Sequence, residues 1–428
     1  AALEMAWRAV VERHGALRLG FRWRGLAYPT QGIGAGVTAP WSVLDLRGEG
    51  AYARALRDLQ ERELRTTFDV ERPPLHRLCV VRSPDGSLDL IWTYFSALLD
   101  GWSSVIVLRD LVAHYAAAVR GAPPPAPAPH FFDHLDRMAA RDWSASEPFF
   151  REALAGYRPP PSIGRPPGGD DQERSTAALP SELRLLFEAL GDKPFRTQGV
   201  GAKSARLSEA DTARLGLAAA RHGVAESTIL QSAWAIALMR EYGCDDILVG
   251  MVAANRPDYE AAVGKYTSML PFRFRLGRPR PLGDWLRGNE RYVLETLAHE
   301  GVPSERWVGA IGLERWQFPF ESTFTFVNYV ARAGGGGGDG PPRVTHCRQL
   351  DAGIPPAFGM VVIPGESHLA RLEYNRAGGF DEARLEGLLD AFLDALARLS
   401  GSPAEADVAS WLGGTLGARS FGVRLGLL

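Results

Sequence analysis

The polar residues best placed to do chemistry lie in one short stretch, residues 94–104. It reads Tyr-Phe-Ser-Ala-Leu-Leu-Asp-Gly-Trp-Ser-Ser. A serine such as Ser96 donates and accepts hydrogen bonds but is not a base near neutral pH. A carboxylate such as Asp100, placed just before a helix, accepts backbone N–H groups. The stretch therefore offers a hydrogen-bonding hydroxyl and a helix-start carboxylate, and it contains no histidine.

A strand and a helix must position this stretch. The apolar run at residues 88–93 predicts a strand. Residues 105–118 predict a helix because apolar side chains recur on one face, at Leu108, Leu111, Val112 and Tyr115. Gly101 permits a tight turn between the two elements. A strand that feeds a helix through such a turn can hold side chains over a cavity.

Similar elements recur along the whole chain. Helices are expected over residues 1–10, 50–66, 130–140, 146–155, 208–222, 227–242, 281–298 and 381–399. Further strands are expected over residues 17–23, 75–82, 204–207, 247–253, 269–276, 324–330 and 369–374. Helices alternating with apolar strands in both halves predict an α/β protein of two lobes.

The length of 428 residues also exceeds what one ordinary core fills. We expect a first lobe over residues 1–165, a Pro- and Gly-rich linker over 166–200 and a second lobe over 201–428. Residues 1–10 already lie inside an amphipathic helix, without the features of a signal peptide. The chain is therefore expected to be part of a longer polypeptide.

Composition argues against several classes of function. A formal net charge of −2 gives no field that would attract nucleic acid or anionic lipid. The apolar stretches are shorter than the roughly 20 residues that span a bilayer. Three separated cysteines, Cys79, Cys244 and Cys347, form neither a disulfide framework nor a metal motif. We therefore expect a cytoplasmic protein that binds no metal, nucleic acid or membrane.

The stretch around Asp100 resembles the signature of the condensation-domain superfamily of nonribosomal peptide synthetases, His-His-x-x-x-Asp-Gly-Trp-Ser. Residues 100–103, Asp-Gly-Trp-Ser, match it, whereas Phe95 and Ser96 occupy the two histidine positions. Five more segments resemble family motifs in the correct order, namely residues 13–18, 254–257, 263–271, 299–305 and 324–329. The chain thus resembles a divergent member that lacks the paired histidines.

This resemblance implies two chloramphenicol acetyltransferase-like lobes that form a V-shaped pseudo-dimer with a central tunnel. The first strand of the first lobe would be missing here. The expected partners are peptidyl or acyl carrier domains, adjacent synthetase domains and a tailoring enzyme. No cofactor would be bound directly, because the phosphopantetheine arms of the carriers would bring tethered substrates into the tunnel.

The resemblance also implies a role for each residue of the motif. Ser96 stands at the catalytic position of the second histidine. Structural roles at the active site fall to Phe95, Asp100, Gly101, Trp102 and Arg256. Tunnel or substrate contacts fall to Ser103, Ser268 and Asn328. Asp100 is expected to pair with Arg256, and the alternative is a helix-start carboxylate that binds only backbone N–H groups.

Two functions stay open on this basis, and we favour the first. One is a module that binds carrier-tethered acyl or peptidyl thioesters without ordinary His-dependent peptide-bond formation, serving docking, transfer or recruitment. The other is an active condensation domain that forms an amide by positioning alone. Heterocyclisation is disfavoured because Phe95 replaces a required Asp, and epimerisation because it needs the missing histidine. No Gly-x-Ser-x-Gly elbow surrounds Ser96, and His14, His134 and His299 are expected to be structural.

Overall fold

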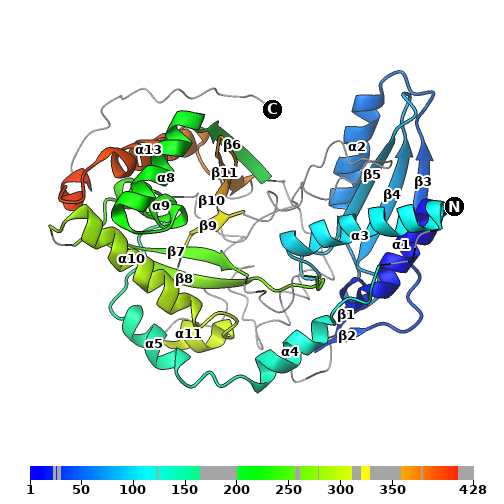
Figure 1. Ribbon diagram of the computed structural model, residues 1–428, viewed down its shortest axis with the longest axis horizontal. Helices are drawn as coiled ribbons and strands as arrows, with labels where there is room; N and C mark the ends of the chain where they lie inside the picture. The colour runs from blue at the N-terminus through cyan, green and yellow to red at the C-terminus, as the bar shows by residue number, and fades with distance from the viewer. Residues whose placement is uncertain are drawn as a thin grey trace.

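A computed structural model describes most of the chain and gives the arrangement shown in Figure 1. The described residues are 1–22, 26, 30–121, 123, 125–163, 200–254, 256, 261–277, 279–310, 320–327, 358–376 and 379–412. Outside this set lie residues 166–199 of the linker predicted over 166–200, the glycine run at 334–338, Asn328 and the residues beyond 412. The predicted domain boundaries accordingly stay a prediction.

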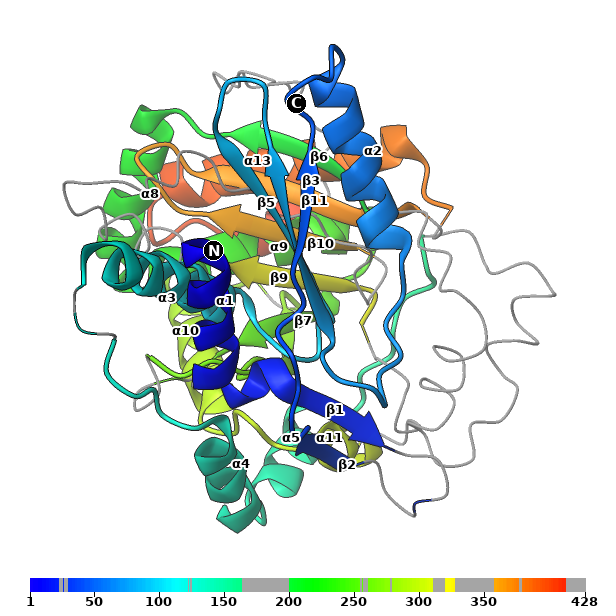
Figure 2. The ribbon, with the colours of Figure 1, turned by 90° about the vertical axis from the view of Figure 1, so that its right-hand side faces the viewer.

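The first half of the chain builds a lobe around a three-stranded sheet. Its elements are α1 (Ala2–Arg13), a 3-10 turn η1 (Gly15–Arg18), β1 (Leu19–Arg22), β2 (Thr30–Ile33), β3 (Ser42–Asp45), α2 (Tyr52–Arg65), β4 (His76–Arg82), β5 (Leu88–Tyr94) and α3 (Gly101–Arg120). The sheet runs β3-β4-β5, with β3 parallel and β5 antiparallel to β4, while β1 and β2 form a separate ribbon. This sheet lies in front of the second sheet in Figure 2.

Alternation along β4 explains why the sheet has two apolar faces. Leu78 joins the core that α1 and α3 share, whereas Cys79 and Val81 pack against Leu59 of α2 on the opposite face. The predicted strands at 75–82 and 88–93 are confirmed. The predicted strand at 17–23 is corrected: Leu17 donates its N–H to His14 in a 3-10 turn, so the strand begins only at Leu19.

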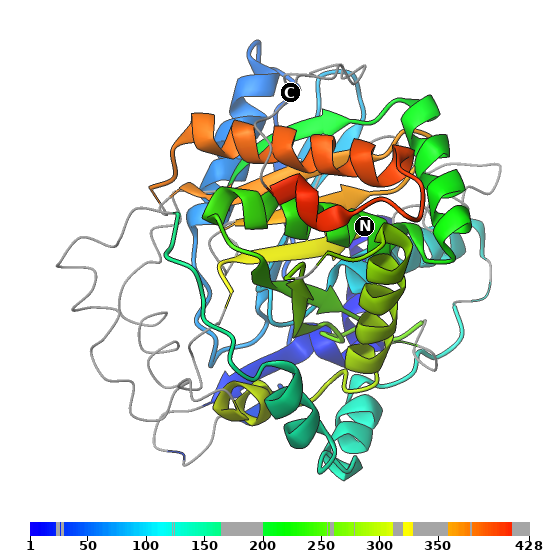
Figure 3. The same cartoon turned by 90° about the vertical axis from the view of Figure 1, so that its left-hand side faces the viewer.

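The second half builds a larger lobe. Its elements are β6 (Val200–Arg206), α8 (Glu209–His222), α9 (Glu226–Tyr242), β7 (Asp246–Ala253), β8 (Ser268–Arg275), α10 (Leu282–Leu297), α11 (Ser304–Ala310), β9 (Ser322–Phe326), β10 (Phe358–Ile363), β11 (Leu369–Asn375), α13 (Glu382–Gly401) and η3 (Val408–Leu412). The sheet order is β6-β11-β10-β9-β7-β8. Figure 3 shows the helices over the face turned away from the first lobe.

Helix α9 is the centre of this lobe. Its residues 233–239 are all buried, as expected for a helix that is apolar on every side. The Ser208 side chain caps α8 by accepting the N–H of Asp211, which agrees with the predicted start of this helix at residue 208. The other predicted helices and strands of this half are also present, while β2, β3, β10 and α11 were not predicted.

Two short helices run between the lobes along the base of the molecule (Figure 1). They are α4 (Phe131–Ala140) and α5 (Ser146–Ala153). Phe131 joins the first core, whereas Phe150 is buried in the second. The fold is thus a two-lobed α/β architecture. No helix within the described ranges is long and apolar enough to cross a membrane.

Candidate functional site

The turn after β5 holds the two positions where the family signature has histidines. Phe95 donates its N–H to the Leu75 carbonyl at 2.9 Å, which continues the pairing of β4 and β5 by one residue. The side chains of Leu98 and Leu99 are buried and anchor the far side of the turn. Ser96 is exposed between these anchors, and its hydroxyl makes no hydrogen bond to any described residue.

Phe95 lies against the core of the first lobe. Its ring is half-buried and meets the ring of Phe21 edge-on, with 6.0 Å between the ring centroids. Trp102 is likewise half-buried against the same core. Both contacts agree with packing roles, which leaves Ser96 as the exposed polar side chain of this turn.

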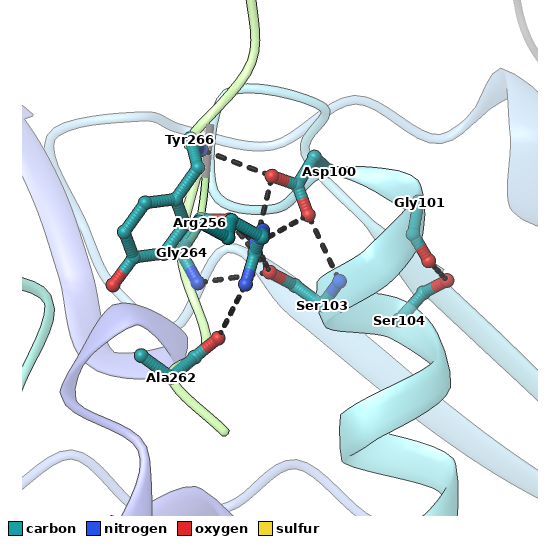
Figure 4. Close-up of polar contacts among 8 residues, drawn as sticks. All are labelled: Asp100, Gly101, Ser103, Ser104, Arg256, Ala262, Gly264 and Tyr266. Carbon is teal, nitrogen blue, oxygen red and sulfur yellow. Dashed lines mark hydrogen bonds and ion pairs between the residues drawn. The ribbon is translucent and has the colours of Figure 1, made fainter. Parts of the chain in front are cut away.

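Asp100 begins helix α3 and also binds the second half of the chain. Its Oδ1 accepts the N–H of Ser103 at 2.8 Å, which caps the helix. Nη2 of Arg256 lies 2.7 Å from Oδ1 and 2.8 Å from Oδ2, and the N–H of Tyr266 reaches Oδ2 at 3.0 Å (Figure 4). The predicted pair and its alternative, a helix cap, are therefore both present on one carboxylate.

This ion pair is deeply buried. The side chains of Asp100 and Arg256 are 2% and 5% exposed. The guanidinium also donates from Nη1 to the Ala262 carbonyl at 2.8 Å, and its Cζ lies 4.0 Å from the centroid of the Tyr266 ring. A buried pair is tolerated when further hydrogen bonds support both charges. Here Asp100 also accepts the N–H groups of Ser103 and Tyr266, and Arg256 also donates to the Ala262 carbonyl. Asp100 uses both oxygens in these contacts and is architectural.

Ser103 ties the same loop to the first turn of α3. Its hydroxyl donates to the Gly264 carbonyl at 2.7 Å and accepts from the Gly264 N–H at 3.0 Å and from Nη2 of Arg256 at 2.7 Å. One donor and two acceptor sites are all that a hydroxyl has. Ser103 is 0% exposed. Its predicted place on the tunnel wall is therefore corrected, because the hydroxyl has no capacity left for a substrate.

We call the set Asp100, Ser103, Arg256, Gly264 and Tyr266 the brace. Its last three members come from the segment between β7 and β8, yet Tyr266 is buried in the first core. Gly101 opens α3 beside the brace, where its carbonyl accepts the Ser104 hydroxyl at 2.7 Å. The brace thus fixes the start of α3, and with it the end of the turn that carries Ser96.

The predicted tunnel contact of Ser268 stays a prediction. Ser268 opens β8 opposite Ala253, and alternation puts it on the same face as Leu270 and Phe272, which lie in the second core. Its hydroxyl is buried without a hydrogen-bond partner among the described residues. The structure therefore turns Ser268 toward the helix-covered face. The third predicted tunnel residue, Asn328, is not among the described residues.

The three histidines expected to be structural are engaged in packing. Nε2 of His14 lies 2.9 Å from Oδ2 of the buried Asp110, and Nδ1 of His299 lies 3.0 Å from the Ser146 hydroxyl. The ring of His134 contacts the Tyr266 ring of the brace. Burial lowers the pKa of His134 and of His299. No group of three or more described His, Cys, Asp or Glu residues could hold a metal ion.

One histidine near the turn is not indicated by the sequence pattern. His76 pairs with Tyr94, the last residue of β5, so it lies one residue from Phe95 in the ladder. Its side chain is 1% exposed and meets the ring of Trp7 edge-on at 5.4 Å. Burial lowers the pKa of His76 to about 4. Only the register of β4 with β5 shows that His76 lies near the turn. Its side chain is buried, whereas Ser96 is exposed to solvent.

Comparison with known proteins identifies one family. The sequence model of the Condensation domain family matches residues 1–409. One component of the linear gramicidin synthase of Brevibacillus parabrevis is 29% identical over 414 residues, which cover 94% of this chain and 8% of that protein. Another component of the same synthase is 32% identical over 340 residues, covering 77% and 4%. The chain therefore spans under a tenth of these relatives.

Solved structures agree on the fold. The X-domain from teicoplanin biosynthesis superimposes with a TM-score of 0.74 at 20% identity, covering 97% of this chain and 90% of that one. The first condensation domain of the calcium-dependent antibiotic synthetase gives a TM-score of 0.68 at 16% identity, covering 96% and 89%. At these identities the likeness concerns architecture alone.

Proposed function

Because this chain belongs to the condensation-domain family of nonribosomal peptide synthetases, we propose that it binds carrier-tethered acyl or peptidyl thioesters without ordinary His-dependent peptide-bond formation. The single observation that carries this proposal is the exposed Ser96 at the end of β5, beside a complete brace. The brace beside the turn is formed, while positions 95 and 96 hold Phe and Ser in place of the two histidines.

The effect of a missing general base on the reaction rate can be estimated. A positioned general base typically contributes about 100- to 10,000-fold to rate. Ser96 cannot supply this because a serine hydroxyl is not a base near neutral pH. His76 cannot substitute, since it is buried and packed against Trp7. Binding of the tethered thioester needs no base and would survive.

A recruitment role is the form of this proposal that a structural neighbour favours. The X-domain from teicoplanin biosynthesis has been solved in complex with OxyB. A chain of that structure superimposes on this one with a TM-score of 0.72. By analogy, this module would hold a carrier-bound peptide while a tailoring enzyme docks beside it. The carrier domains, the neighbouring synthetase domains and that enzyme are its proposed partners.

An active domain that works by positioning is the second candidate. A free α-amine titrates near about pH 8, so part of it is neutral without any base. Alignment of two tethered reactants lowers the barrier by itself. The intact brace favours this candidate, because it holds the turn rigidly whatever residue stands at position 96.

The test compares Ser96→His with the native domain in the full polypeptide. Both flanking carrier domains are loaded with aminoacyl phosphopantetheine, carrier binding is measured by titration, and amide product is followed by mass spectrometry. We expect binding of the loaded carrier by both proteins and product only from Ser96→His. Ser410→His, an exposed serine in η3, is the matched control and should stay silent.

Product from the native domain at a rate close to that of Ser96→His would establish the second candidate instead. In that case Ser96→Ala decides the role of the hydroxyl, since unchanged turnover removes it from the mechanism. Failure of the native domain to bind any loaded carrier would reject both candidates.

A further inference from the structure

Helix α4 joins the two lobes and contacts the brace. Its first residue, Phe131, packs in the first core, and Met138 near its end packs against the second. Both ends sit on glycines from the second half of the chain. A Cβ on Gly264 would lie 2.2 Å from Cδ2 of Phe131, and one on Gly301 would lie 2.8 Å from Sδ of Met138. The helix is thus tightly seated at both ends.

The side chain of His134 points from this helix to the brace. Its ring centroid lies 4.6 Å from that of Tyr266, and Phe131 meets the same ring edge-on at 5.2 Å. Tyr266 also contacts the guanidinium of Arg256, and its own N–H binds Asp100. One aromatic ring is therefore held by α4 and by the cation of the brace together.

Charge decides how well this arrangement holds. The face of an aromatic ring attracts a cation, and Arg256 already occupies that role on Tyr266. A proton on His134 would place a second positive charge against the same ring. Burial lowers the pKa of His134, and two positive groups, Arg256 from the loop and Arg137 from its own helix, lower it further.

We propose that His134 is a positioning residue, whose neutral ring holds Tyr266, and through it Arg256, on Asp100. Protonation of His134 loosens the loop at residues 261–266 and frees the start of α3, and with it the turn that carries Ser96. This regulation by pH rests on the proposed function in one respect, namely that the turn carrying Ser96 meets the tethered substrate.

Amide hydrogen exchange tests the proposal without any carrier or substrate. The N–H groups of Gly264 and Tyr266 donate directly to Ser103 and Asp100, so their protection reports whether the brace is closed. Between about pH 7.5 and pH 5, and after correction for intrinsic exchange, we expect these two amides to lose about tenfold in protection. Amides of β4 in the first lobe and of α9 in the second serve as internal references. Protection of the two brace amides is expressed relative to that of β4, so that a general loss of stability in the first lobe is not counted.

Variants separate the ring from its charge. His134→Phe keeps an aromatic ring and should keep full protection at both pH values. His134→Ala should show weak protection at both. His114→Phe, a half-buried histidine of α3 whose pKa burial also lowers, is the matched control and should behave as the native domain does.

Two results would overturn the proposal. One is protection of Gly264 and Tyr266 that does not change with pH in the native domain. The other is a pH dependence that persists in His134→Phe. Either would leave the carrier-binding proposal intact, because carrier titration at neutral pH does not depend on this exchange measurement. Conversely, a domain that binds no carrier could still show the expected exchange.

Discussion

The brace and the turn beside it lie only a few residues apart, yet they differ in burial and in hydrogen bonding. Asp100 and Ser103 are buried, and all the hydrogen-bonding sites of the Ser103 hydroxyl are taken by other parts of the protein. Ser96 is exposed, and its hydroxyl bonds to no described residue. Groups that hold position are saturated, whereas a group that meets a substrate must keep a free site.

The two halves of the signature motif therefore have different roles, one in holding the lobes together and one at the site of chemistry. The matching half of the signature, residues 100–103, builds the junction between the lobes. In the differing half, Phe95 packs against the core of the first lobe and Ser96 is exposed. Substitution there leaves the junction untouched, which explains how a family fold persists around a changed site.

Breaking the buried ion pair should have the largest effect. Asp100→Asn leaves the Arg256 guanidinium buried without a counter-charge, so we expect a loss of about 3–5 kcal/mol in the free energy of unfolding. Urea denaturation measures it. The control is Asp45→Asn in the exposed pair with Arg47, where solvent screens the interaction and little change is expected. Equal losses in the two variants would refute the structural weight given to the brace.

Acid should destabilise the first lobe through His76. The pKa of His76 is about 4 in the folded state, against about 6.5 when unfolded. Between these values only the unfolded chain binds the proton, so stability falls as the pH drops below about 6.5 and levels off below about 4, by about 3 kcal/mol in total.

Comparison with His76→Phe isolates this contribution, because other histidines titrate in the same range. The variant keeps a ring against Trp7 and should lack that part of the acid-induced loss. Identical pH profiles for the two proteins would show that His76 is not held neutral.

Crowding the loop should have an intermediate effect. Gly264→Ala forces a methyl group into the Phe131 ring, and overpacking of this kind costs about 1–3 kcal/mol. Pairing it with Phe131→Leu should recover part of the loss, since the two positions touch. Gly288→Ala in α10, where a Cβ meets no atom within 4 Å, should instead stabilise by about 0.5–1 kcal/mol.

The smallest effect is expected at the turn. Ser96→Ala should change the free energy of unfolding by less than about 0.5 kcal/mol, because the hydroxyl is exposed. Ser103→Ala, the same change a few positions further along the same motif, should cost about 1–3 kcal/mol by leaving buried partners unsatisfied. Similar losses in both would remove the distinction between the two regions.

The sequence predicted most regular elements because their periodicity is local. The strands β4 and β5 and helix α3 follow from apolar spacing alone. Short elements were missed for the same reason: β3 has four residues, most of them exposed, and α11 has seven. So few residues cannot establish a period.

The site was predictable only where a family resemblance linked distant residues. The Asp100–Arg256 pair joins positions 156 residues apart, which no spacing rule connects. The resemblance did not reveal what Ser103 binds, because its partner is the backbone of Gly264. The orientation of Ser268 depends on the register of β8 with β7, which composition does not encode.

The crossing of chain segments between the lobes bears on how such synthetases can be recombined. Phe150 from the first half fills the second core, and Tyr266 from the second half fills the first. A chimera joined between the halves would pair each hydrophobic interior with foreign side chains at both places. Both halves should therefore come from the same parent when modules are exchanged. Otherwise the residues around Phe150 and Tyr266 should be exchanged together with them.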